Sequence, residues 1–449
     1  MAKKKAAEEQ QEVKQQREIQ IIEDPVMAVR TVPDMYIGSL GSAGFLNMFR
    51  EITQNSLDEI ERGTTLDKNI IISYDARSHL VINEDNGQGI PLDKLVKVFS
   101  VLHSSSNYHK TEGTGYTSGK NGVGATITNF LSKFFVVESY RMDGTAGKVE
   151  FEEGYLNKKG LQKIKCPAGK HGLITTFQPS DMRGEITIGD EEIEALLRQL
   201  CLINAIGTRI TFNAITKTGM KRKVILENKG GIFELLGMIC QKPLFEPVYF
   251  SMDDGSKFIE CLFTYDISAM DDPQILSYAN MCPTNGGTHV NGFLDALVKY
   301  FRNYMNKIVL AGNKKLAVNA QDIRTGLRAV VIVKSISPIY TGQSKEFYSE
   351  ENMAGFVSSV ALTALDEWSK KFPGDLQKAS KYLKEVCEIR SKSDNEKIKM
   401  SDKFTSSAIT GLPVKYKRPN GRGPFELIIT EGDSATSGME NNRDKATQG

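Results

Sequence analysis

The sequence predicts a mixed α/β protein with two successive domains and the beginning of a third. In the first region, a helical pattern at Gly44 to Ile60 is followed by strand patterns at Asn69 to Tyr74 and Leu80 to Asn83, which a turn joins. The second region has its own strand patterns at Phe258 to Thr264 and Ala329 to Lys334. The first region therefore reads as an α/β sandwich, and the second as a separate α/β domain.

Length and local composition divide the chain into five expected segments. At roughly 150 residues per domain, 449 residues suggest about three domains. The charged run 381–403 predicts a long exposed helix or a linker, and an apolar strand at 425–430 opens the last segment. The expected segments are a solvated N-terminal arm (1–20), a first domain (21–225), a second domain (226–395) with a helix at 354–371, a linker (396–424) and an incomplete further domain (425–449).

Charge and cysteine usage restrict the possible partners and compartments. The formal net charge is only +2, so the chain as a whole neither requires nor excludes a polyanionic partner, and any DNA contact must be local. Six cysteines without a C-x-x-C pair speak against a zinc site and fit reduced thiols. The sequence has no signal-peptide pattern and no apolar run long enough to cross a bilayer. We therefore expect a soluble, cytoplasmic protein.

The predicted helix at 44–60 carries a cluster of polar side chains on one face. At 100° per residue, Glu51, Asn55, Asp58 and Glu59 lie together, opposite the apolar positions. Beside a phosphate-binding pocket, a carboxylate can deprotonate an attacking water, and an amide oxygen one turn later suits magnesium. The alternative is that these residues form the solvated side of an ordinary amphipathic helix.

Two further polar motifs follow the predicted strands. In Glu84-Asp-Asn-Gly-Gln-Gly-Ile-Pro91, the carboxylate of Asp85 stands before glycines that permit close approach of a ligand, and it could accept the exocyclic amine of adenine. A simple turn is the alternative. Later, Ser118-Gly-Lys-Asn-Gly-Val-Gly124 runs into a helical pattern at 125–132, where free backbone N–H groups could surround phosphate oxygens. This loop matches neither the P-loop nor the Rossmann pattern.

Together, and in this order, Glu51-x-x-x-Asn55, Asp85-x-Gly-x-Gly89 and Gly119 to Gly124 resemble the ATP-binding motifs shared by gyrase, heat-shock protein 90, histidine kinases and MutL. The resemblance implies a Bergerat-type (GHKL) ATPase sandwich. The motifs Met35 to Gly38 and Ser104 to Tyr108 narrow the resemblance to type II DNA topoisomerases. The residues of the later motif are more similar to those of the eukaryotic and viral members than to those of bacterial gyrase.

The resemblance assigns a role to each motif. Glu51 would be the general base, Asn55 the magnesium ligand and Asp85 the adenine contact. Residues 119–124 would cover the phosphates as a lid. The positions that it assigns to ATP binding, beyond Asn55 and Asp85, are Gly89, Ile90, Ser105, Ser106, Asn107, Gly119, Lys120, Asn121, Gly122, Val123 and Gly124.

Signatures in the second region extend the same resemblance. Asn285 to Phe293 and Asp322 to Ala329 are similar to segments of the transducer domain, a ribosomal-S5-like α/β fold, although a turn and a strand start are the simpler interpretations. Gln343-Ser-Lys345 is similar to the family's Gln-Thr-Lys, which implies that Gln343 and Lys345 bind ATP and that Lys345 contributes to catalysis. Glu431-Gly-Asp-Ser-Ala435 resembles the start of a Toprim domain, in which Glu431 would be a catalytic metal ligand.

Two positions depart from the family pattern. The family usually places an adenine-contacting threonine where this chain has Leu173, which leaves Thr175 or Thr176 as substitutes. Asp34 replaces the glycine of the Pro-Gly-Met-Tyr run. Neither change removes a catalytic group.

The resemblance implies an ATP-operated dimeric gate that passes one DNA duplex through another. Two copies of the chain would bind ATP and Mg²⁺ and close around double-stranded DNA, with basic stretches at 381–403 and 415–422 supplying phosphate contacts. The nucleophilic tyrosine would lie on a cleavage subunit or C-terminal region, so this chain alone would act only as an ATPase. The expected location is the cytoplasm of a bacterium or of a virus-infected host cell, in association with the nucleoid. The alternatives are a MutL-like or chaperone-like ATPase clamp, and a nucleotide-gated DNA clamp without cleavage.

Overall fold

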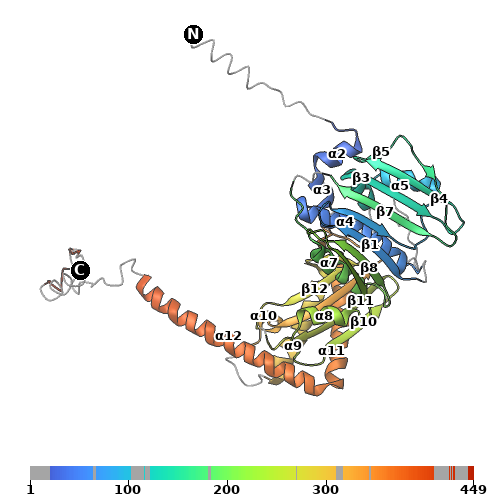
Figure 1. Cartoon of the computed structure of the whole chain (residues 1–449). Helices are drawn as coiled ribbons and strands as arrows, with labels where there is room; N and C mark the ends of the chain where they lie inside the picture. Colours follow the sequence, from blue (N-terminus) through green and yellow to red (C-terminus); the bar gives the residue numbers. More distant parts are fainter. Residues whose placement is uncertain are drawn as a thin grey trace, which may run out of the picture.

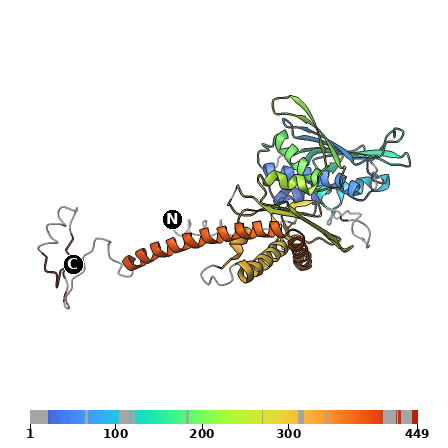
Figure 2. The same cartoon turned by 90° about the horizontal axis from the view of Figure 1, so that it is seen from below.

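In the part of the chain that it describes, the computed structural model has two large β-sheets with helices packed on them, a small two-stranded sheet, and a long helix that projects from the region of the second large sheet (Figures 1 and 2). The structure describes residues 21–63, 67–102, 116, 122–180, 184–268, 270–309, 317–342, 345–408, 424, 426, 428–429 and 443–448. Within these residues, no helix combines the length and the apolar character needed to span a membrane.

Among the described residues, nine strands form the first sheet, in the order β5-β4-β3-β7-β2-β1-β8-β9, with β6 added beside β4. Neighbours pair antiparallel except β1 and β8, which are parallel. The strands expected at 69–74 and 80–83 are confirmed as β1 and β2. The bounds are β1 Asn69–Asp75, β2 Leu80–Glu84, β3 Ser132–Tyr140, β4 Ala146–Glu152, β5 Tyr155–Leu156, β6 Gln162–Lys163, β7 Gly172–Pro179, β8 Arg209–Ile215 and β9 Lys221–Glu227.

Helices cover one face of this sheet because its strands alternate buried and partly exposed residues. In β1 the buried positions are Ile70, Ile72 and Tyr74, and they share one core with Phe45 and Phe49 of α4. Figure 1 shows α4, α5 and α7 against the sheet. The helices of this region are α2 Pro25–Thr31, α3 Pro33–Ile37, α4 Gly41–Glu61, α5 Leu92–Ser100, α6 Gly124–Phe130 and α7 Asp190–Leu202.

Two helix predictions in this region differ from the structure at their ends. The helix expected at 44–60 is α4, which begins three residues earlier, at Gly41, and ends at Glu61. The helix expected at 125–132 is α6, which ends at Phe130. Ser132 instead begins β3, whose alternating residues Phe135 and Val137 are fully buried. The β-branched and aromatic run after Leu131 favours a strand, and this preference ends the helix early.

The second sheet has five strands in the described part of the chain, in the order β10-β11-β15-β12-β13. Nearly every residue of β15 is buried, because helix α8 covers one face of the sheet while α9 and α11 cover the other. The expected strands at 258–264 and 329–334 are β11 and β15, and the expected helix at 354–371 is α11. The bounds are α8 Ile232–Ile239, β10 Val248–Asp253, β11 Lys257–Tyr265, β12 Gln274–Ala279, β13 Cys282–Thr284, α9 Thr288–Tyr304, the π-helix η1 Met305–Val309, α10 Ala320–Arg324, β15 Leu327–Ser335 and α11 Glu351–Lys371.

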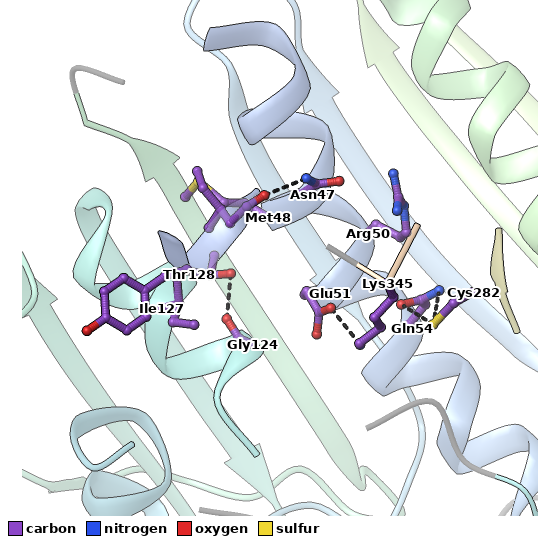
Figure 3. A pocket seen from close by; sticks show the side chains of 12 residues that line it. Asn47, Met48, Arg50, Glu51, Gln54, Gly124, Ile127, Thr128, Cys282 and Lys345 are labelled. Atoms are coloured by element: carbon purple, nitrogen blue, oxygen red, sulfur yellow. Dashed lines mark hydrogen bonds and ion pairs between the residues drawn. The ribbon is translucent and has the colours of Figure 1, made fainter. Parts of the chain in front are cut away.

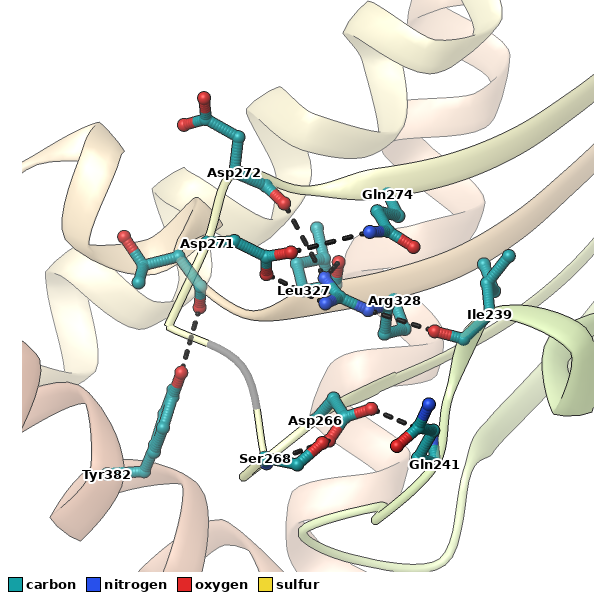
Figure 4. A network of polar contacts seen from close by, with 11 residues as sticks. Ile239, Gln241, Asp266, Ser268, Asp271, Asp272, Gln274, Leu327, Arg328 and Tyr382 are labelled. Atoms are coloured by element: carbon teal, nitrogen blue, oxygen red, sulfur yellow. Dashed lines mark hydrogen bonds and ion pairs between the residues drawn. The ribbon is translucent and has the colours of Figure 1, made fainter.

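Arg328, which lies within the signature at 322–329, connects the end of α8 to the segment before β12 at one end of the second sheet (Figure 4). Its side chain is buried, donates from Nε to the carbonyl of Ile239 at 3.0 Å and pairs with Asp271 at 2.7 Å. The carbonyl of Ile239 belongs to the last residue of α8, and Asp271 precedes β12. Because a buried guanidinium requires such partners, Arg328 fixes the end of α8 to the sheet.

The charged run at 381–403 lies within α12 Pro373–Ala408, the long helix seen in Figures 1 and 2. The expectation that this run is exposed is wrong for its first part, because Leu383 and Cys387 are fully buried in the second core. Arg390 adds an ion pair with the buried Asp322, at 2.6 Å from Nε to Oδ1. Helix α12 also passes through residue 395, the expected end of the second domain. The expected segment boundaries remain predictions.

Candidate active site

Helix α4 presents a stripe of polar side chains to the second sheet. Glu51 contacts Lys345 at 2.8 Å, and Gln54, one turn later, donates from Nε2 to the carbonyl of Met281 at 2.9 Å. Two turns further along, Glu61 forms an ion pair with Lys334. Positions 51, 54 and 61 lie on one face because a helix repeats every 3.6 residues. This stripe is therefore an interface within the molecule. Of the face predicted from the sequence, Glu51 belongs to this interface, whereas Asn55 is exposed.

Glu51 lies in a pocket between α4, the start of α6 and the loop before β16 Phe347–Tyr348 (Figure 3). Lys345 is 7% exposed, and its Nζ points at the Glu51 carboxylate. Burial alone would lower the pKa of Lys345, but the neighbouring charge of Glu51 outweighs it and raises the pKa above its usual value. Lys345 is therefore a fully protonated cation beside the carboxylate.

The start of α6 forms the opposite wall of this pocket. A Cβ atom on Gly124 would lie 2.1 Å from Oε2 of Glu51, so only glycine allows the backbone of α6 to approach the carboxylate this closely. The residues that line the pocket are Tyr36, Ile37, Asn47, Met48, Arg50, Glu51, Gln54, Gly124, Ile127, Thr128, Cys282 and Lys345.

Asp85 lies apart from this pocket, on the neighbouring side of α4. Its Oδ2 accepts from the hydroxyl of Ser56 at 2.9 Å, and its Oδ1 accepts from the backbone N–H groups of Gly87 and Leu173 at 2.9 and 3.2 Å. The residue is only 8% exposed. Burial raises the pKa of Asp85 to about 6, despite these hydrogen bonds, which act in the opposite direction. The carboxyl group therefore changes charge near neutral pH.

Gly89 and Ile90 hold the segment after Asp85 against β3. Gly89 has a φ of +66°, and a Cβ atom there would lie 2.4 Å from the carbonyl oxygen of Tyr140. Ile90 and Ser139 exchange two hydrogen bonds, each 2.8 Å long. The glycine is thus required by a left-handed turn and a close backbone contact, and both residues fix the position of the loop that begins at Asp85.

Leu173 contacts Asp85 through its backbone. The type of side chain at position 173 does not affect this contact. The N–H of Leu173 is the group that donates to Asp85. The preceding residue, Gly172, has a φ of +109°, and a Cβ atom built on it would lie 2.0 Å from the carbonyl oxygen of Asp85. Of the two threonines considered as substitutes, Thr175 is buried in β7 opposite Asn83, and Thr176 is partly buried on the other face.

The structure places the remaining expected residues unevenly. Asn55 follows Glu51 by one turn of α4 and has an exposed side chain, and Gly122 and Val123 lead directly into α6. Other expected positions lie outside the described residues, namely Ser105, Ser106, Asn107, Gly119, Lys120, Asn121, Gln343 and Glu431. The strand expected at 425–430 also lies mostly outside them, although Glu426 forms a bridge with Gln448.

Several residues of the site were not identified from the sequence. Ser56 and Asn83 support Asp85, because Asn83 donates from Nδ2 to the Ser56 hydroxyl at 2.9 Å. Gln54 and Cys282 join α4 to the second sheet within the pocket. Arg50 adds a second cation to the pocket lining. Arg50 directly precedes Glu51 in the sequence. At 100° per residue it does not lie on the predicted polar face of the helix, so the sequence gave no signal for it.

Comparison with known sequences supports one family. The sequence model of the DNA gyrase B family matches residues 231–399. The chain is 28% identical to DNA gyrase B of Thermus thermophilus over 435 residues, which cover 94% of this chain and 67% of that protein. It is 29% identical to DNA gyrase B of Campylobacter jejuni over 444 residues, covering 94% and 55%. It is 28% identical to the corresponding subunit of DNA topoisomerase 4 from Staphylococcus aureus over 459 residues, covering 96% and 66%.

Comparison with solved structures gives the same result. The 43K ATPase domain of Thermus thermophilus gyrase B, in complex with an aminocoumarin, superposes with a TM-score of 0.63 at 26% identity, covering 83% of this chain and 98% of that one. Over most of its length, the chain is similar to the ATPase subunits of type II topoisomerases. The ATPase and transducer domains of topoisomerase II from Balamuthia mandrillaris share the fold, with a TM-score of 0.63 at 18% identity over 84% of this chain and 100% of that one.

The similarity confirms the predicted fold class, a GHKL ATPase sandwich followed by a transducer domain. The matched part of gyrase B is its 43K ATPase domain, which implies that this chain binds a nucleotide. The chain spans about half to two thirds of the length of the curated relatives described above. The expected Toprim segment lies outside the described residues and remains a prediction.

Replacing Gly124 by alanine is expected to lower ATP turnover by roughly 10- to 100-fold, because the added Cβ displaces the Glu51 carboxylate and a misplacement of about 1 Å costs on this order. Phosphate release by the purified variant measures the effect. Gly237→Ala is the matched control, since a Cβ atom at this helical glycine meets no atom within 4 Å. Unchanged turnover in Gly124→Ala would contradict the close packing of α6 against Glu51.

Proposed function

We propose that this chain hydrolyses ATP in the pocket between α4 and the Lys345 loop, with Glu51 as the general base. The observation that carries this proposal is the contact of Glu51 with Lys345 across 294 positions of sequence, against a glycine at the start of α6. A carboxylate and a buried cation are thereby held in one small polar pocket. Such a pair suits phosphoryl transfer, in which a water loses a proton while negative charge redistributes over phosphate oxygens.

The proposed reaction uses the two charges in sequence. Without a phosphate, Lys345 neutralises Glu51, which makes the carboxylate a poor proton acceptor. A γ-phosphate that enters between them gives the Lys345 cation a second anionic partner, which leaves Glu51 free to orient a water and to accept its proton. Lys345 then stabilises the negative charge on the phosphate oxygens. Because Lys345 lies just before β16, in the second region of the chain, its position would also report to that region whether the γ-phosphate is present.

Asp85 is proposed to bind the adenine ring. Its carboxylate is buried, held by Ser56 and by two backbone N–H groups, and is thus rigidly oriented to accept a further hydrogen bond from an exocyclic amine. The Leu173 N–H keeps its contact whatever the side chain is, which explains how a leucine can occupy the position where the family usually has threonine.

Magnesium is proposed to enter with the nucleotide. Within the described part of the chain, no group of three or more His, Cys, Asp or Glu side chains could hold a metal ion. Mg²⁺ does not need such a group, because it is usually bound by one or two protein oxygens together with phosphates and waters. Asn55, one turn after Glu51 and exposed, would be the protein ligand. Bound there, the ion would offset charge on the phosphate chain and fix its orientation.

The larger activity is proposed on the pattern of the relatives, which are subunits of DNA gyrase and DNA topoisomerase 4. Two copies of the chain would dimerise when ATP binds and capture a DNA duplex, with the shift of Lys345 coupling nucleotide state to the second sheet. Cleavage would need a partner subunit or region with the nucleophilic tyrosine, and Glu431 would belong to that metal-assisted step. The comparisons favour this reading over a MutL-like or chaperone-like clamp.

Two measurements test this function. The purified chain should release phosphate from ATP, faster when double-stranded DNA is present, and should dimerise with a non-hydrolysable ATP analogue. Absence of phosphate release above buffer would overturn the ATPase proposal. In complete assemblies, supercoil relaxation should require ATP. ATP-dependent DNA capture without any strand passage would instead support the clamp without cleavage.

A further inference from the structure

Residues 285–289, which we name the Gly-Gly clamp, pair with the segment that follows Lys345. Strand β14 Gly286–Gly287 runs parallel to β16 Phe347–Tyr348 in a two-stranded sheet of its own. The N–H of Asn285 donates to the carbonyl of Glu346 at 2.7 Å. The clamp therefore grips the chain immediately after Lys345, and it is distinct from the pocket that holds the Lys345 side chain.

The backbone of Lys345 is strained, so contacts with surrounding residues must hold it in place. Its φ is +58°, in the left-handed region, which is unfavourable for a residue with a side chain. A non-glycine residue keeps such a conformation only where its surroundings impose it. Its N–H also donates to the carbonyl of Gly342 at 3.2 Å, so Lys345 is held by this hydrogen bond on one side and by the clamp on the other.

Gly287 makes the clamp contact possible. Its φ is +142°, and a Cβ atom built on it would lie 2.2 Å from the carbonyl oxygen and 2.7 Å from the nitrogen of Tyr348. These are backbone atoms, which cannot swing aside as the end of a side chain can. Any other residue at 287 would therefore push β16, and with it the turn at Lys345, away from α4.

The next two clamp residues fix the far end of the same segment. Thr288 donates from Oγ1 to the carbonyl of Glu350 at 2.8 Å. His289 is fully buried and packs edge-on against the ring of Tyr348, with 5.3 Å between ring centroids. Burial lowers the pKa of His289 to about 3, so the imidazole is neutral and acts by packing. The clamp thus holds residues 346–350 at both ends.

We propose that Gly287, Thr288 and His289 are positioning residues for the ATPase reaction, which act by holding Lys345 in register with Glu51. This inference rests on the proposed ATPase function. It gives the signature at 285–293 a physical task, which is to hold the segment after Lys345 so that its side chain reaches the nucleotide pocket. The clamp residues themselves contact neither Glu51 nor the pocket.

The test compares Gly287→Ala in two backgrounds, the wild-type chain and Lys345→Ala. In the wild-type background we expect kcat to fall by about 100-fold, the typical effect of a displacement near 1 Å, with a smaller change in KM. In the Lys345→Ala background, we expect little further loss, because the residue that the clamp positions is already gone. Gly355→Ala, where a Cβ atom meets nothing within 4 Å, is the matched control.

A second readout does not depend on activity. The buried Lys345 amine should react slowly with an acylating reagent in the nucleotide-free wild type and faster in Gly287→Ala, while the exposed Lys133 reacts equally in both. Thr288→Val should act in the same direction and Thr288→Ser should restore wild-type behaviour, which covers the case that Gly287→Ala fails to fold.

Equal losses of kcat in both backgrounds, or unchanged labelling of Lys345 in folded variants, would overturn the inference. If the wild-type chain itself lacks ATPase activity, the proposed function fails and the labelling result still decides whether the clamp positions Lys345.

Discussion

Replacement of Glu51 by glutamine is expected to lower the turnover number for ATP by about 10²- to 10⁴-fold, the usual contribution of a general base. Glutamine keeps the shape of the side chain but cannot accept a proton from water. The nucleotide should still bind, because Asp85 and the phosphate contacts are unchanged. The measurement is steady-state phosphate release, combined with titration of a fluorescent ATP analogue to determine its Kd.

Glu61→Gln is the matched control for this substitution. Glu61 lies on the same helix and also pairs with a lysine of the second sheet, Lys334, but it is not among the residues that line the pocket. Loss of an interdomain ion pair alone should therefore leave turnover close to the wild-type value. Equal rates for the wild type and Glu51→Gln would remove Glu51 as the base, and equal losses in both variants would show that α4 acts only as a structural interface.

Helix α4 shows how far sequence patterns lead. Its apolar positions Phe45, Phe49 and Ile52 predicted both the helix and its buried face, because a period of 3.6 residues is a local property. The same pattern placed Asp58 on the polar face, yet Asp58 is buried in the structure. The second sheet contacts α4 through Gln54 and Glu61, beside that face, and only the tertiary arrangement shows these contacts.

The candidate site was partly predictable for a similar reason. The carboxylate of Glu51 and the cation of Lys345 were each assigned by resemblance, but their contact joins two regions 294 positions apart, and no spacing rule encodes it. Leu173 illustrates the converse. A sequence comparison registers a changed side chain there, whereas the structure uses the backbone N–H, which the change leaves intact.

Sharing one helix between the two regions has a mechanical consequence. Any movement of Lys345 toward a phosphate breaks its pair with Glu51 while the contacts of Gln54 and Glu61 with the second sheet remain. We expect these remaining contacts to act as a pivot along α4, so that a change in the pocket would rotate the second sheet. Helix α12, fixed to that sheet through Asp322 and Arg390, would carry the rotation outward.

The second prediction concerns Asp85 and pH. Its carboxyl pKa is about 6 in the folded chain, against 3.8 for an ordinary aspartate. Because folding favours the protonated form, the contribution of this group to stability is fully present below pH 3.8 and is lost as pH rises to about 6. The difference corresponds to about 3 kcal/mol. Asp85→Asn should therefore raise the free energy of unfolding by up to this amount at pH 8, and change it little at pH 4.

Ligand binding should show the opposite dependence, because an adenine amine donates to the ionised carboxylate. Affinity for adenosine, which carries no titrating phosphate, should be constant above pH 7 and about tenfold weaker at pH 5 than on this plateau. Asp85→Asn should bind adenosine roughly 10- to 100-fold more weakly at pH 8, because the neutral amide replaces the carboxylate that accepts the hydrogen bond of the adenine amine. Its affinity should not vary between pH 5 and 8. Calorimetric titrations of both proteins across this range decide the matter, and a wild-type affinity independent of pH would show that the buried carboxyl group does not contact the base.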